Sequence, residues 1–563
     1  MRLSDKIKDN KFKAVALWVW LMLLLLLPNG CLMFTERVPA APWAAVVGAL
    51  AFFLVPAAAY LWLSTLCRNI GKTVWIMFPL LFLSAFQIVL LDLFGRSVIA
   101  VDMWLNLVTT NASEVGELLG CMVFAITFVV VAYVPPLAMA VYAWRGRWLL
   151  PDRLIRRARV AAAVVGSVGF VLMTAVLTTQ PRVKIYNDMY PVNVVYNACL
   201  AVEREAQTKS YRSTSSSYDF GASSVRPDSI AEAYILVIGE TARSDHFQLF
   251  GYDRATTPRL SAREGVVGYK NTLSESNTTH KSVPMLLSHI DARTFGDSIY
   301  RVKGVAEAFR EAGFRTAFFS NQQRNGSFID FFGQQADTCV YLRDNYKGSA
   351  AHAPKDMDLI PLVEHELNSG PAKRLIILHT YGSHFRYNDR YTEEYAAFDV
   401  GGELDVSPRN RERLIAAYDN TINYTDAFLD RLIDCLDFLS TQTITGLLYT
   451  SDHGEDIYDD NSGQFLHASP LPTIHQISVP FLLWLSKGLT ANYPEMAAAA
   501  TGNCNAAVSS TRSVFHTLLH MGGVSARQLD TTQSVLSRSY AEPFPRLYLD
   551  DHNRAMPLSA MLR

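Results

Sequence analysis

Five apolar stretches in the first third of the chain are each long enough to cross a lipid bilayer. They run roughly over residues 14–34, 43–66, 74–94, 121–144 and 160–177. A helix that spans the hydrocarbon core needs about 20 apolar residues. We therefore expect a membrane domain of five transmembrane helices over residues 1–178. A cleaved signal peptide is not expected, because the first stretch is long and four more follow it.

Lysine and arginine residues around these stretches predict their orientation. The positive charges concentrate before the first stretch and in the loops after the second and fourth, whereas the other loops carry few. Cytoplasmic loops of membrane proteins are enriched in these residues, so the amino terminus should be cytoplasmic. Five spans then place everything after about residue 180 on the opposite side of the membrane.

One loop on that outer side carries three polar side chains with helical spacing. Asn111, Glu114 and Glu117 are three residues apart, so a helix would present them on one face just above the bilayer. In that position they could receive a lipid headgroup that carries an ammonium group. A solvated interfacial helix is the alternative that the spacing leaves open.

Residues 179–230 are expected to connect the membrane domain to a soluble domain. Their first part, residues 186–205, is amphipathic and suited to the membrane surface. The following stretch, residues 210–229, is rich in serine, which is typical of a flexible linker. The segment therefore predicts interfacial helices followed by a linker.

Beyond the linker, strand and helix patterns alternate. Strands are expected at residues 234–238, 316–319, 375–379 and 446–450, and helices at residues 302–312, 354–368, 411–439 and 510–521. Such alternation is typical of a mostly parallel sheet with helices on both faces. We therefore expect one α/β domain over residues 231–563.

The composition narrows the chemistry of this domain. A formal net charge of −1 argues against a nucleic-acid-binding protein, which would show a basic face. All 13 histidines follow residue 230, so metal or proton chemistry belongs to the soluble domain. Four cysteines lie on the outer side, where they could form disulfides in three full pairings or stay free thiols: Cys199, Cys339, Cys435 and Cys504.

Polar residues follow the predicted strands at the point where each strand ends. Glu240 comes after the first strand and its glycine, and Asp452 with His453 follows the last strand. His384 and Asn321 follow the two strands between them. The carboxyl ends of parallel strands share one edge of a sheet, so these side chains can converge. Glutamate, aspartate and histidine are ligands that zinc accepts, and the sequence therefore predicts a zinc site.

Several other polar residues have two interpretations. Thr241 has a side chain suited to a helix N-cap, and we expect it to open a helix after Glu240. Lys281 and Arg243 could bind phosphate oxygens, although either could be an ordinary surface charge. His516 and His520 have the spacing of metal ligands, but no glutamate follows His516, so we expect them to be structural.

Taken together, these motifs resemble the bacterial phosphoethanolamine transferase family, within the alkaline phosphatase and sulfatase superfamily. The similar runs are Gly239–His246, Gly251–Pro258, Ser282–Pro284, His379–His384 and Ser451–Glu455. The resemblance covers both halves of the chain, including the five spans. It implies a protein of the bacterial inner membrane whose catalytic domain is periplasmic. It also implies phosphatidylethanolamine as the donor and lipid A or a lipopolysaccharide core sugar as the acceptor.

The resemblance also assigns roles to particular residues. It implies that Glu240, Asp452 and His453 bind zinc. The family's nucleophilic threonine, which also contacts the metal, lies three residues before a Ser-Val-Pro sequence. Here that position is Thr279, with Thr278 as the neighbour that the pattern does not exclude.

Two histidines and one loop complete the resemblance. His384 and His467 match histidines that line the family's substrate site, and residues 110–117 are similar to its headgroup-facing loop. Many relatives carry disulfide-forming cysteines around the nucleophile, whereas this chain has Ser-Glu-Ser-Asn at residues 274–277. Disulfide bracing of the nucleophile segment is therefore not expected here.

The sequence thus predicts zinc-dependent transfer of phosphoethanolamine to lipopolysaccharide through a covalent intermediate on Thr279. A phosphoglycerol transferase or phosphodiester hydrolase of the same superfamily is an alternative. A catalytically silent, membrane-anchored binding protein is another. Sulfatase activity is disfavoured, because the chain has no Cys-x-Pro-x-Arg or Ser-x-Pro-x-Arg sequence. The acceptor, the number of zinc ions and the oligomeric state stay open.

Overall fold

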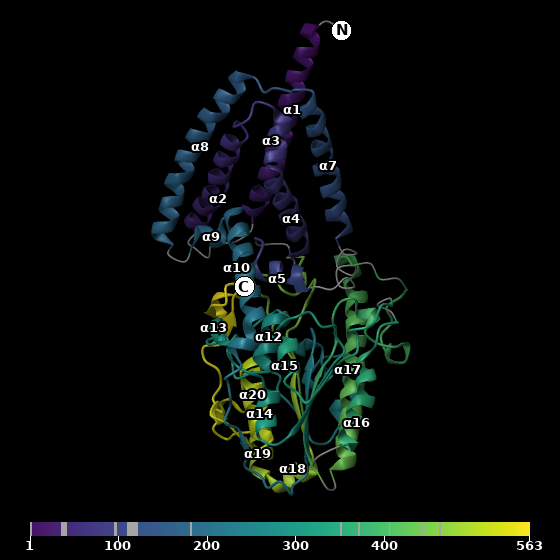
Figure 1. Ribbon diagram of the computed structural model, residues 1–563. Helices are drawn as coiled ribbons and strands as arrows, with labels where there is room; N and C mark the ends of the chain where they lie inside the picture. The colour runs from purple at the N-terminus through teal and green to yellow at the C-terminus, as the bar shows by residue number, and fades with distance from the viewer. Residues whose placement is uncertain are drawn as a thin grey trace. The chain divides into compact units, whose positions relative to one another are not determined.

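The computed structural model describes residues 3–34, 42–94, 98–109, 122–180, 183–348, 352–369, 372–402, 404, 406–440, 443–460 and 463–562. Its contacts divide the chain into two units (Figure 1). The first comprises Met1–Trp104 and Leu118–Glu203, and the second comprises Leu105–Glu117 and Arg204–Arg563. The boundary after Glu203 falls inside the segment that the sequence predicts to connect two domains.

Long apolar helices build the first unit. Four of them are long and apolar enough to cross a membrane: α1 (Leu3–Leu32), α2 (Pro42–Leu63), α7 (Val123–Arg145) and α8 (Asp152–Thr179). The predicted third span is a pair of helices, α3 (Ile70–Ile76) and α4 (Phe78–Phe94), bent by 60°. Within the described residues the unit therefore has four membrane-crossing helices, or five if the bent pair is one span.

The serine-rich stretch at residues 210–229 is folded, although the sequence suggests a flexible linker. Helix α10 (Val192–Thr214) continues into it. The buried Tyr211 donates its hydroxyl to the carbonyl of Val302 at 2.7 Å. Phe220 is fully buried and stacks on Phe515, with 5.7 Å between the ring centroids. Aromatic side chains within the stretch thus fix it to the soluble unit, and the serine content alone could not reveal this.

A seven-stranded sheet forms the centre of the second unit, in the order β3-β11-β8-β2-β7-β5-β6. The strands are β2 (Glu232–Gly239), β3 (Val266–Gly268), β5 (Arg315–Ser320), β6 (Thr338–Tyr341), β7 (Lys373–His379), β8 (Ile444–Ser451) and β11 (Phe481–Leu485). Strands β6, β5, β7, β2 and β8 are parallel, whereas β11 and β3 are antiparallel at one edge. The predicted mostly parallel sheet is confirmed.

Helices cover both faces of this sheet (Figure 1). One face packs against α12 (Thr279–Leu286), α14 (Val305–Glu311), α15 (Phe328–Gly333) and α20 (Ser510–Met521). The other face is covered by α16 (Ile360–Asn368) and α17 (Arg411–Leu439). Every residue of β2 is buried, as expected of a central parallel strand whose two faces are both covered. The four predicted strands and four predicted helices all correspond to elements of this unit.

Smaller elements surround the sheet. Two-stranded pairs are formed by β1 (Ser223–Ser224) with β13 (Val524–Ser525), β4 (Thr272–Leu273) with β12 (Val508–Ser509), β9 (Asp456–Ile457) with β10 (Phe465–Leu466), and β14 (Leu547–Leu549) with β15 (Ala555–Pro557). Among the described residues, the remaining α-helices of this unit are α11 (Pro258–Ala262), α13 (Phe295–Ser298), α18 (Lys487–Asn492) and α19 (Pro494–Gly502), and two more, α5 (Val101–Thr109) and α9 (Ile185–Asp188), occur earlier in the chain. Two of these pairs, β9 with β10 and β14 with β15, contribute to the site described below.

The cysteines in the described residues are free thiols. This group includes Cys199, Cys339, Cys435 and Cys504, for which the sequence leaves disulfide pairing open. Burial raises the pKa of both Cys339 and Cys435 to about 11. Their thiolate forms are therefore scarce near neutral pH, which slows thiol–disulfide exchange.

A buried ion pair beside β2 offers a test of the fold. Arg226 Nη1 lies 2.6 Å from Glu232 Oε2, and the two side chains are 4% and 0% exposed. We expect Arg226→Met to lower the free energy of unfolding by about 3 kcal/mol, because it removes the closest partner of a buried carboxylate. Chemical denaturation of the full-length protein in detergent measures this loss.

The matched control is Arg527→Met, because Arg527 pairs with Asp219 where both side chains are mostly exposed. An exposed pair contributes at most about 1 kcal/mol. Equal losses in the two variants would contradict a stabilising role for the buried pair.

Candidate functional site

Side chains that follow neighbouring strands meet at the carboxyl edge of the sheet. Glu240 follows β2, and Asp452 with His453 follows β8, which pairs with β2 in parallel. His384 comes from the loop after β7, the other neighbour of β2. Because β2 lies between β7 and β8, the topology of the sheet brings these residues to one place.

The four residues predicted to bind metal lie in contact with one another. His453 Nε2 is 3.1 Å from Thr279 Oγ1, 3.2 Å from Asp452 Oδ2 and 3.4 Å from Glu240 Oε1. Thr279 donates its hydroxyl to Glu240 Oε1 at 3.2 Å. Glu240, Asp452 and His453 are almost completely buried, whereas Thr279 is half-buried at the start of α12. A hydroxyl group therefore lies against two carboxylates and an imidazole.

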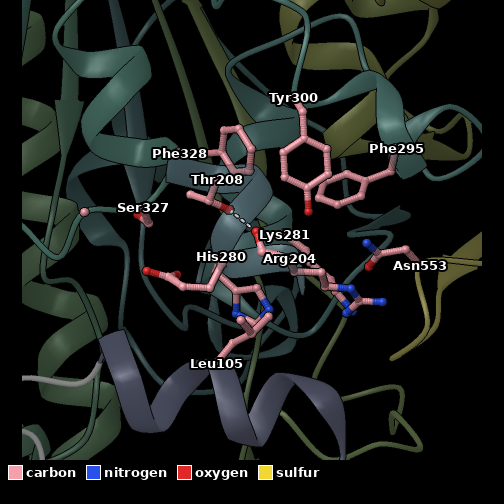
Figure 2. Close-up of a pocket in the computed structure, with 12 residues that line it drawn as sticks. Leu105, Arg204, Thr208, His280, Lys281, Phe295, Tyr300, Ser327, Phe328 and Asn553 are labelled. Atoms are coloured by element: carbon pink, nitrogen blue, oxygen red, sulfur yellow. Dashed lines mark hydrogen bonds between the residues drawn. The ribbon is translucent and has the colours of Figure 1, made fainter. Parts of the chain in front are cut away.

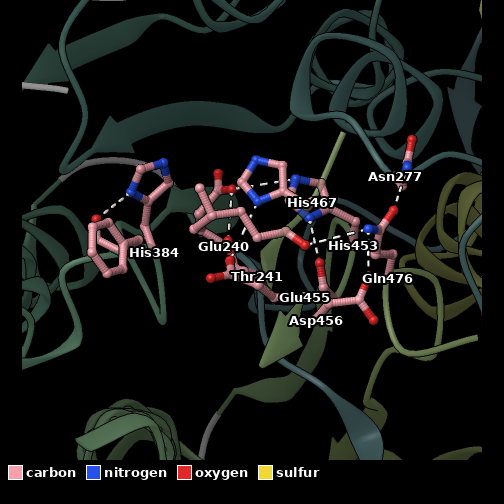
Figure 3. Close-up of polar contacts among 12 residues, drawn as sticks. Glu240, Thr241, Asn277, His384, His453, Glu455, Asp456, His467 and Gln476 are labelled. Atoms are coloured by element: carbon pink, nitrogen blue, oxygen red, sulfur yellow. Dashed lines mark hydrogen bonds and ion pairs between the residues drawn. The ribbon is translucent and has the colours of Figure 1, made fainter. Parts of the chain in front are cut away.

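Three histidines of the site each direct Nδ1 toward a protein oxygen (Figure 3). His453 and His384 each hydrogen-bond through Nδ1 to the carbonyl oxygen of the following residue, at 2.9 and 2.6 Å. His467 Nδ1 lies 3.3 Å from Glu455 Oε2. Since carbonyl and carboxylate oxygens only accept hydrogen bonds, Nδ1 carries the hydrogen in the neutral rings. Each Nε2 then keeps its lone pair, as a metal ligand or proton acceptor requires.

The electrostatics of the cluster favour a bound cation. Burial, reinforced by the Asp452 carboxylate, raises the pKa of Glu240, and burial also raises the pKa of Asp452. Burial lowers the pKa of His453 well below its usual range, so this imidazole is neutral. Two desolvated carboxylates beside neutral nitrogen donors are the chemistry of a divalent metal site.

His467 belongs to the same cluster. One donor atom from each of Glu240, His453 and His467 can be chosen so that all three lie within 4.8 Å of one another. The rings of His467 and His453 have centroids 4.2 Å apart. The residues that fit a metal therefore include His467, in addition to the four that the sequence predicts.

Thr241 does not cap a helix, and that prediction is wrong. Its backbone has φ of 64°, in the left-handed region, and the next helical turn is the 3₁₀ segment Ser244–His246. The Thr241 hydroxyl donates to Glu240 Oε1 at 3.1 Å, and its amide donates to Asp452 Oδ1 at 3.1 Å. Tyr418 donates to the Thr241 carbonyl at 2.8 Å. Thr241 therefore orients the two carboxylates.

Gln322, which the sequence analysis missed, reaches the cluster from the end of β5. Its Nε2 donates to Glu240 Oε2 at 3.1 Å. The predicted residue at this position, Asn321, is fully buried: it donates to Asp356 Oδ1 at 2.7 Å and accepts from Arg343 Nε at 3.3 Å. The sequence predicts correctly that the end of β5 supplies a residue to the site. It does not show that the side chain of Gln322, and not that of Asn321, points toward Glu240. Substrate binding by Asn321 stays a prediction.

Glu455 is another residue that the sequence analysis did not assign. It is completely buried, accepts a hydrogen bond from the Tyr387 hydroxyl at 2.5 Å, and anchors His467. The intervening Gly454 is required sterically, because a Cβ there would lie 2.1 Å from the carbonyl oxygen of His475. The Asp-His-Gly-Glu run thus supplies two residues of the cluster, a close backbone approach and an anchor for His467.

Arg243 is a buried structural residue, and not a surface charge. Its guanidinium pairs with Asp245 at 2.6 Å and with Asp459 at 2.7 Å. It also contacts His475 Nδ1 at 2.7 Å. These partners occupy its nitrogen atoms, so Arg243 braces the loops behind the cluster.

A pocket opens beside the candidate nucleophile (Figure 2). It is partly open to solvent, and His280 and Lys281, directly after Thr279, form part of its wall. Other residues that line it include Arg204, the acidic Glu205, Thr208, Phe295, Tyr300, Phe328 and Asn553. The buried Lys281 donates from Nζ to the carbonyl of Asp550 at 3.0 Å, so its ammonium group is held in place. Cationic and aromatic groups together suit an anion joined to an apolar or cationic group.

The remaining candidates lie elsewhere. Asn111, Glu114 and Glu117 fall outside the residues that the structure describes, so their contact with a headgroup stays a prediction. His516 Nδ1 accepts a backbone amide at 3.1 Å, and His520 Nδ1 contacts a serine hydroxyl at 3.0 Å. These two histidines have structural partners away from the sheet edge.

Known proteins share this architecture. The family model described as Sulfatase matches residues 232–524. Phosphoethanolamine transferase EptA of Escherichia coli O157:H7 is 30% identical over 307 residues, which cover 54% of this chain and 55% of that protein. Kdo(2)-lipid A phosphoethanolamine 7''-transferase of Escherichia coli (strain K12) is 28% identical over 267 residues, 46% of each chain. The chain therefore spans about half the length of the curated relatives it matches.

Two solved structures extend the comparison. The integral membrane protein lipooligosaccharide phosphoethanolamine transferase A (EptA) from Neisseria meningitidis has a TM-score of 0.70 at 20% identity, over 92% of this chain and 98% of that chain. The periplasmic domain of EptC from Escherichia coli, in complex with Zn, has a TM-score of 0.54 at 25% identity, over 61% and 96%. The comparison with the integral membrane protein shows that this chain shares its whole fold, a helical unit followed by an α/β unit.

Glu275, four residues before Thr279, makes the stability of the site pH-dependent. It is buried and accepts hydrogen bonds from the Ala292 amide at 2.9 Å and the Thr511 hydroxyl at 3.1 Å. Burial raises its pKa from 4.5 to about 7. As pH rises between these values, Glu275 loses its proton in the unfolded chain before it does so in the folded protein. The free energy of unfolding therefore falls progressively, and the loss is complete above about pH 7.

We expect Glu275→Gln to stabilise the protein at pH 8 by on the order of 3 kcal/mol relative to the wild type. The gain should shrink toward zero near pH 4.5, where Glu275 is protonated in both states. Denaturation at several pH values measures this difference. Glu264→Gln, at an exposed side chain, is the control and should give no such trend. A pH-independent gain would contradict the ionisation argument.

Proposed function

This chain belongs to the sulfatase family, and we propose that it transfers phosphoethanolamine from phosphatidylethanolamine to a lipopolysaccharide acceptor. The observation that carries the proposal is the Thr279 hydroxyl, 3.1 Å from His453 and 3.2 Å from Glu240 at the buried sheet edge. The transferred group is supported by the relatives named phosphoethanolamine transferases, and the acceptor by the relative that acts on Kdo(2)-lipid A.

We infer that the site binds zinc through Glu240, Thr279, Asp452 and His453, with His467 as a further ligand or a substrate contact. Support comes from the buried carboxylates, from the inward Nε2 atoms, and from the zinc complex of the related EptC domain. When bound, zinc would favour the alkoxide of a threonine and withdraw charge from a phosphoryl oxygen.

Transfer then needs two displacements at phosphorus. In the first, Thr279 Oγ1 forms a bond to phosphorus, the bond to the glycerol oxygen breaks, and diacylglycerol leaves with a proton. In the second, a protonated acceptor oxygen, from a hydroxyl or a phosphate, attacks the same phosphorus, the bond from phosphorus to Thr279 Oγ1 breaks, and the proton lost by the acceptor is returned to Thr279. His384 and His467 are suited to move these protons, because each holds Nδ1 against a protein acceptor and directs Nε2 away from it.

The pocket beside Thr279 is the proposed place for the donor headgroup. Lys281 and Arg204 supply positive charge for the phosphodiester, His280 supplies an imidazole, and Phe295 and Tyr300 supply aromatic surface. By resemblance, Asn111, Glu114 and Glu117 would contact the ethanolamine ammonium. The loop charges support a cytoplasmic amino terminus, and the resemblance supports a bacterial protein whose soluble unit is periplasmic.

The first test separates two adjacent threonines. We expect Thr279→Ala to lower headgroup transfer from labelled phosphatidylethanolamine by at least about 10³-fold, because it removes the attacking oxygen. Thr278→Ala is the matched control: Thr278 Oγ1 contacts Ser276 Oγ at 3.1 Å, and this variant should keep most of the activity. Mass spectrometry of lipopolysaccharide from cells that express each variant identifies the acceptor.

Full transfer by Thr279→Ala, or equal losses in both variants, would overturn the assignment of the nucleophile. Release of free phosphoethanolamine without transfer to any acceptor would identify a hydrolase instead.

A second test concerns the metal. We expect the purified full-length protein to contain zinc, and Asp452→Asn to weaken its retention by about 10- to 100-fold, because it removes one anionic ligand. Elemental analysis after dialysis measures the zinc. Asp419→Asn is the control, since Asp419 is equally buried but pairs with His246. Equal zinc loss in both variants would contradict the proposed ligand set.

A further inference from the structure

The backbone on both sides of His467 is strained. Leu466 has φ of 68° and Ala468 has φ of 61°, both in the left-handed region, and neither residue is glycine. In this region the Cβ atom crowds the following carbonyl oxygen. Such a conformation persists only where the surrounding structure fixes it more strongly than the strain opposes it. The hydrogen bonds that other residues make to this segment must therefore hold it in the strained conformation.

Gln476 bonds the segment on its amino-terminal side. Its Nε2 donates to the Leu466 carbonyl at 3.3 Å and to Asp456 Oδ2 at 2.6 Å. Its Oε1 lies 2.8 Å from the hydroxyl oxygen of Ser469, beyond His467, and that hydroxyl shares its one hydrogen with the Leu471 carbonyl at 2.7 Å. Asp456 directly follows Glu455, the residue that anchors the His467 ring. Gln476 thus links the strand β10, which precedes His467, to the partner strand β9.

Asn277 bonds the segment on its carboxyl-terminal side. Its Nδ2 donates to the Ser469 carbonyl at 2.8 Å, and its backbone carbonyl accepts the Ala468 amide at 3.2 Å. Its Oδ1 accepts from the Tyr548 hydroxyl at 2.6 Å. Asn277 lies two residues before Thr279, so the same residue belongs to the nucleophile segment.

The two side-chain amides are bonded to each other (Figure 3). Asn277 Nδ2 donates to Gln476 Oε1 at 2.6 Å, and the two residues are 2% and 1% exposed. With the contacts above, both donors of each NH₂ group are used and each amide oxygen has an acceptor role. Flipping the Asn277 amide would place its oxygen against the Ser469 carbonyl, so its orientation is fixed.

We propose that Asn277 and Gln476 are positioning residues that hold His467 against the cluster by bonding its segment to the one that carries Thr279. The proposal rests on the proposed transferase function. Neither side chain reaches the reacting group; they act through His467, whose ring centroid lies 4.2 Å from that of His453. Without the amide pair, the strained segment relaxes and His467 moves out of place, although the nucleophile and donor pocket remain.

The experiment measures transfer by the full-length protein, with phosphatidylethanolamine in mixed micelles as the donor. We expect Gln476→Ala and Asn277→Ala to lower kcat by about 10-fold or more with little change in the donor KM, since neither residue lines the pocket. The milder Ser469→Ala, which removes the serine hydroxyl bond to Gln476, should give a smaller loss.

A double-mutant cycle separates positioning from general loss of structure. In a His467→Ala background, Gln476→Ala should lower kcat by less than about twofold, because the side chain that it positions is already gone. Asn503→Ala is the matched control, since that amide also donates to two carbonyls, of Val535 and Ser537, away from the site. It should leave kcat near the wild-type value.

Hydrogen exchange gives a readout that does not depend on activity. The Ala468 amide should exchange faster in Gln476→Ala and Asn277→Ala, and at the wild-type rate in Asn503→Ala. An unchanged kcat in both amide variants would overturn the proposal, as would an equal loss with and without His467. Absence of transfer by the wild-type protein would instead overturn the proposed function, and accelerated exchange alone would then still support the structural coupling.

Discussion

The gathering of the Glu240 and Asp452 carboxylates around His453 Nε2, at the ends of β2 and β8, is the constraint on which the rest of the site depends. Both groups are buried, and each raises the cost of ionising its neighbour. The structure offsets part of this cost with donors fixed by the sheet: the amides of Thr241 and His453 donate to Asp452 Oδ1, at 3.1 and 2.7 Å. A bound cation would offset the cost of ionising the two carboxylates that these hydrogen bonds do not cover.

Each side chain of the cluster is held from behind by a group that the sheet or its loops supply. Gln322 donates to Glu240, and the carbonyl after each of His453 and His384 fixes the ring through Nδ1. Glu455 does the same for His467, and is itself bonded by a tyrosine. The reacting groups therefore enter the site with their orientations already set, which lowers the reorganisation that a reaction requires.

The groups that hydrogen-bond to the side chains of the cluster explain which parts of the site the sequence could predict. Glu240, Asp452 and His453 follow apolar strands directly, so strand periodicity and parallel topology were sufficient to bring them together. Thr279 depended on a resemblance, because it begins a helix and follows no strand of the central sheet. Gln322 and the left-handed Thr241 depend on side-chain direction and on contacts between distant segments. Local patterns do not contain that information.

Hydrogen bonds brace the nucleophile segment, whose Ser-Glu-Ser-Asn run at residues 274–277 contains no cysteine. The carboxyl-terminal hairpin β14–β15 bonds it at three points: the Leu549 amide to the Glu275 carbonyl at 2.7 Å, Tyr548 to Asn277 at 2.6 Å, and Lys281 to the Asp550 carbonyl at 3.0 Å. These bonds lie on both sides of Thr279. Hydrogen bonds constrain the folded state without cross-linking the unfolded chain, so the bracing needs no oxidant and exists only once the hairpin has docked. Formation of the site is thereby tied to folding of the last segment of the chain.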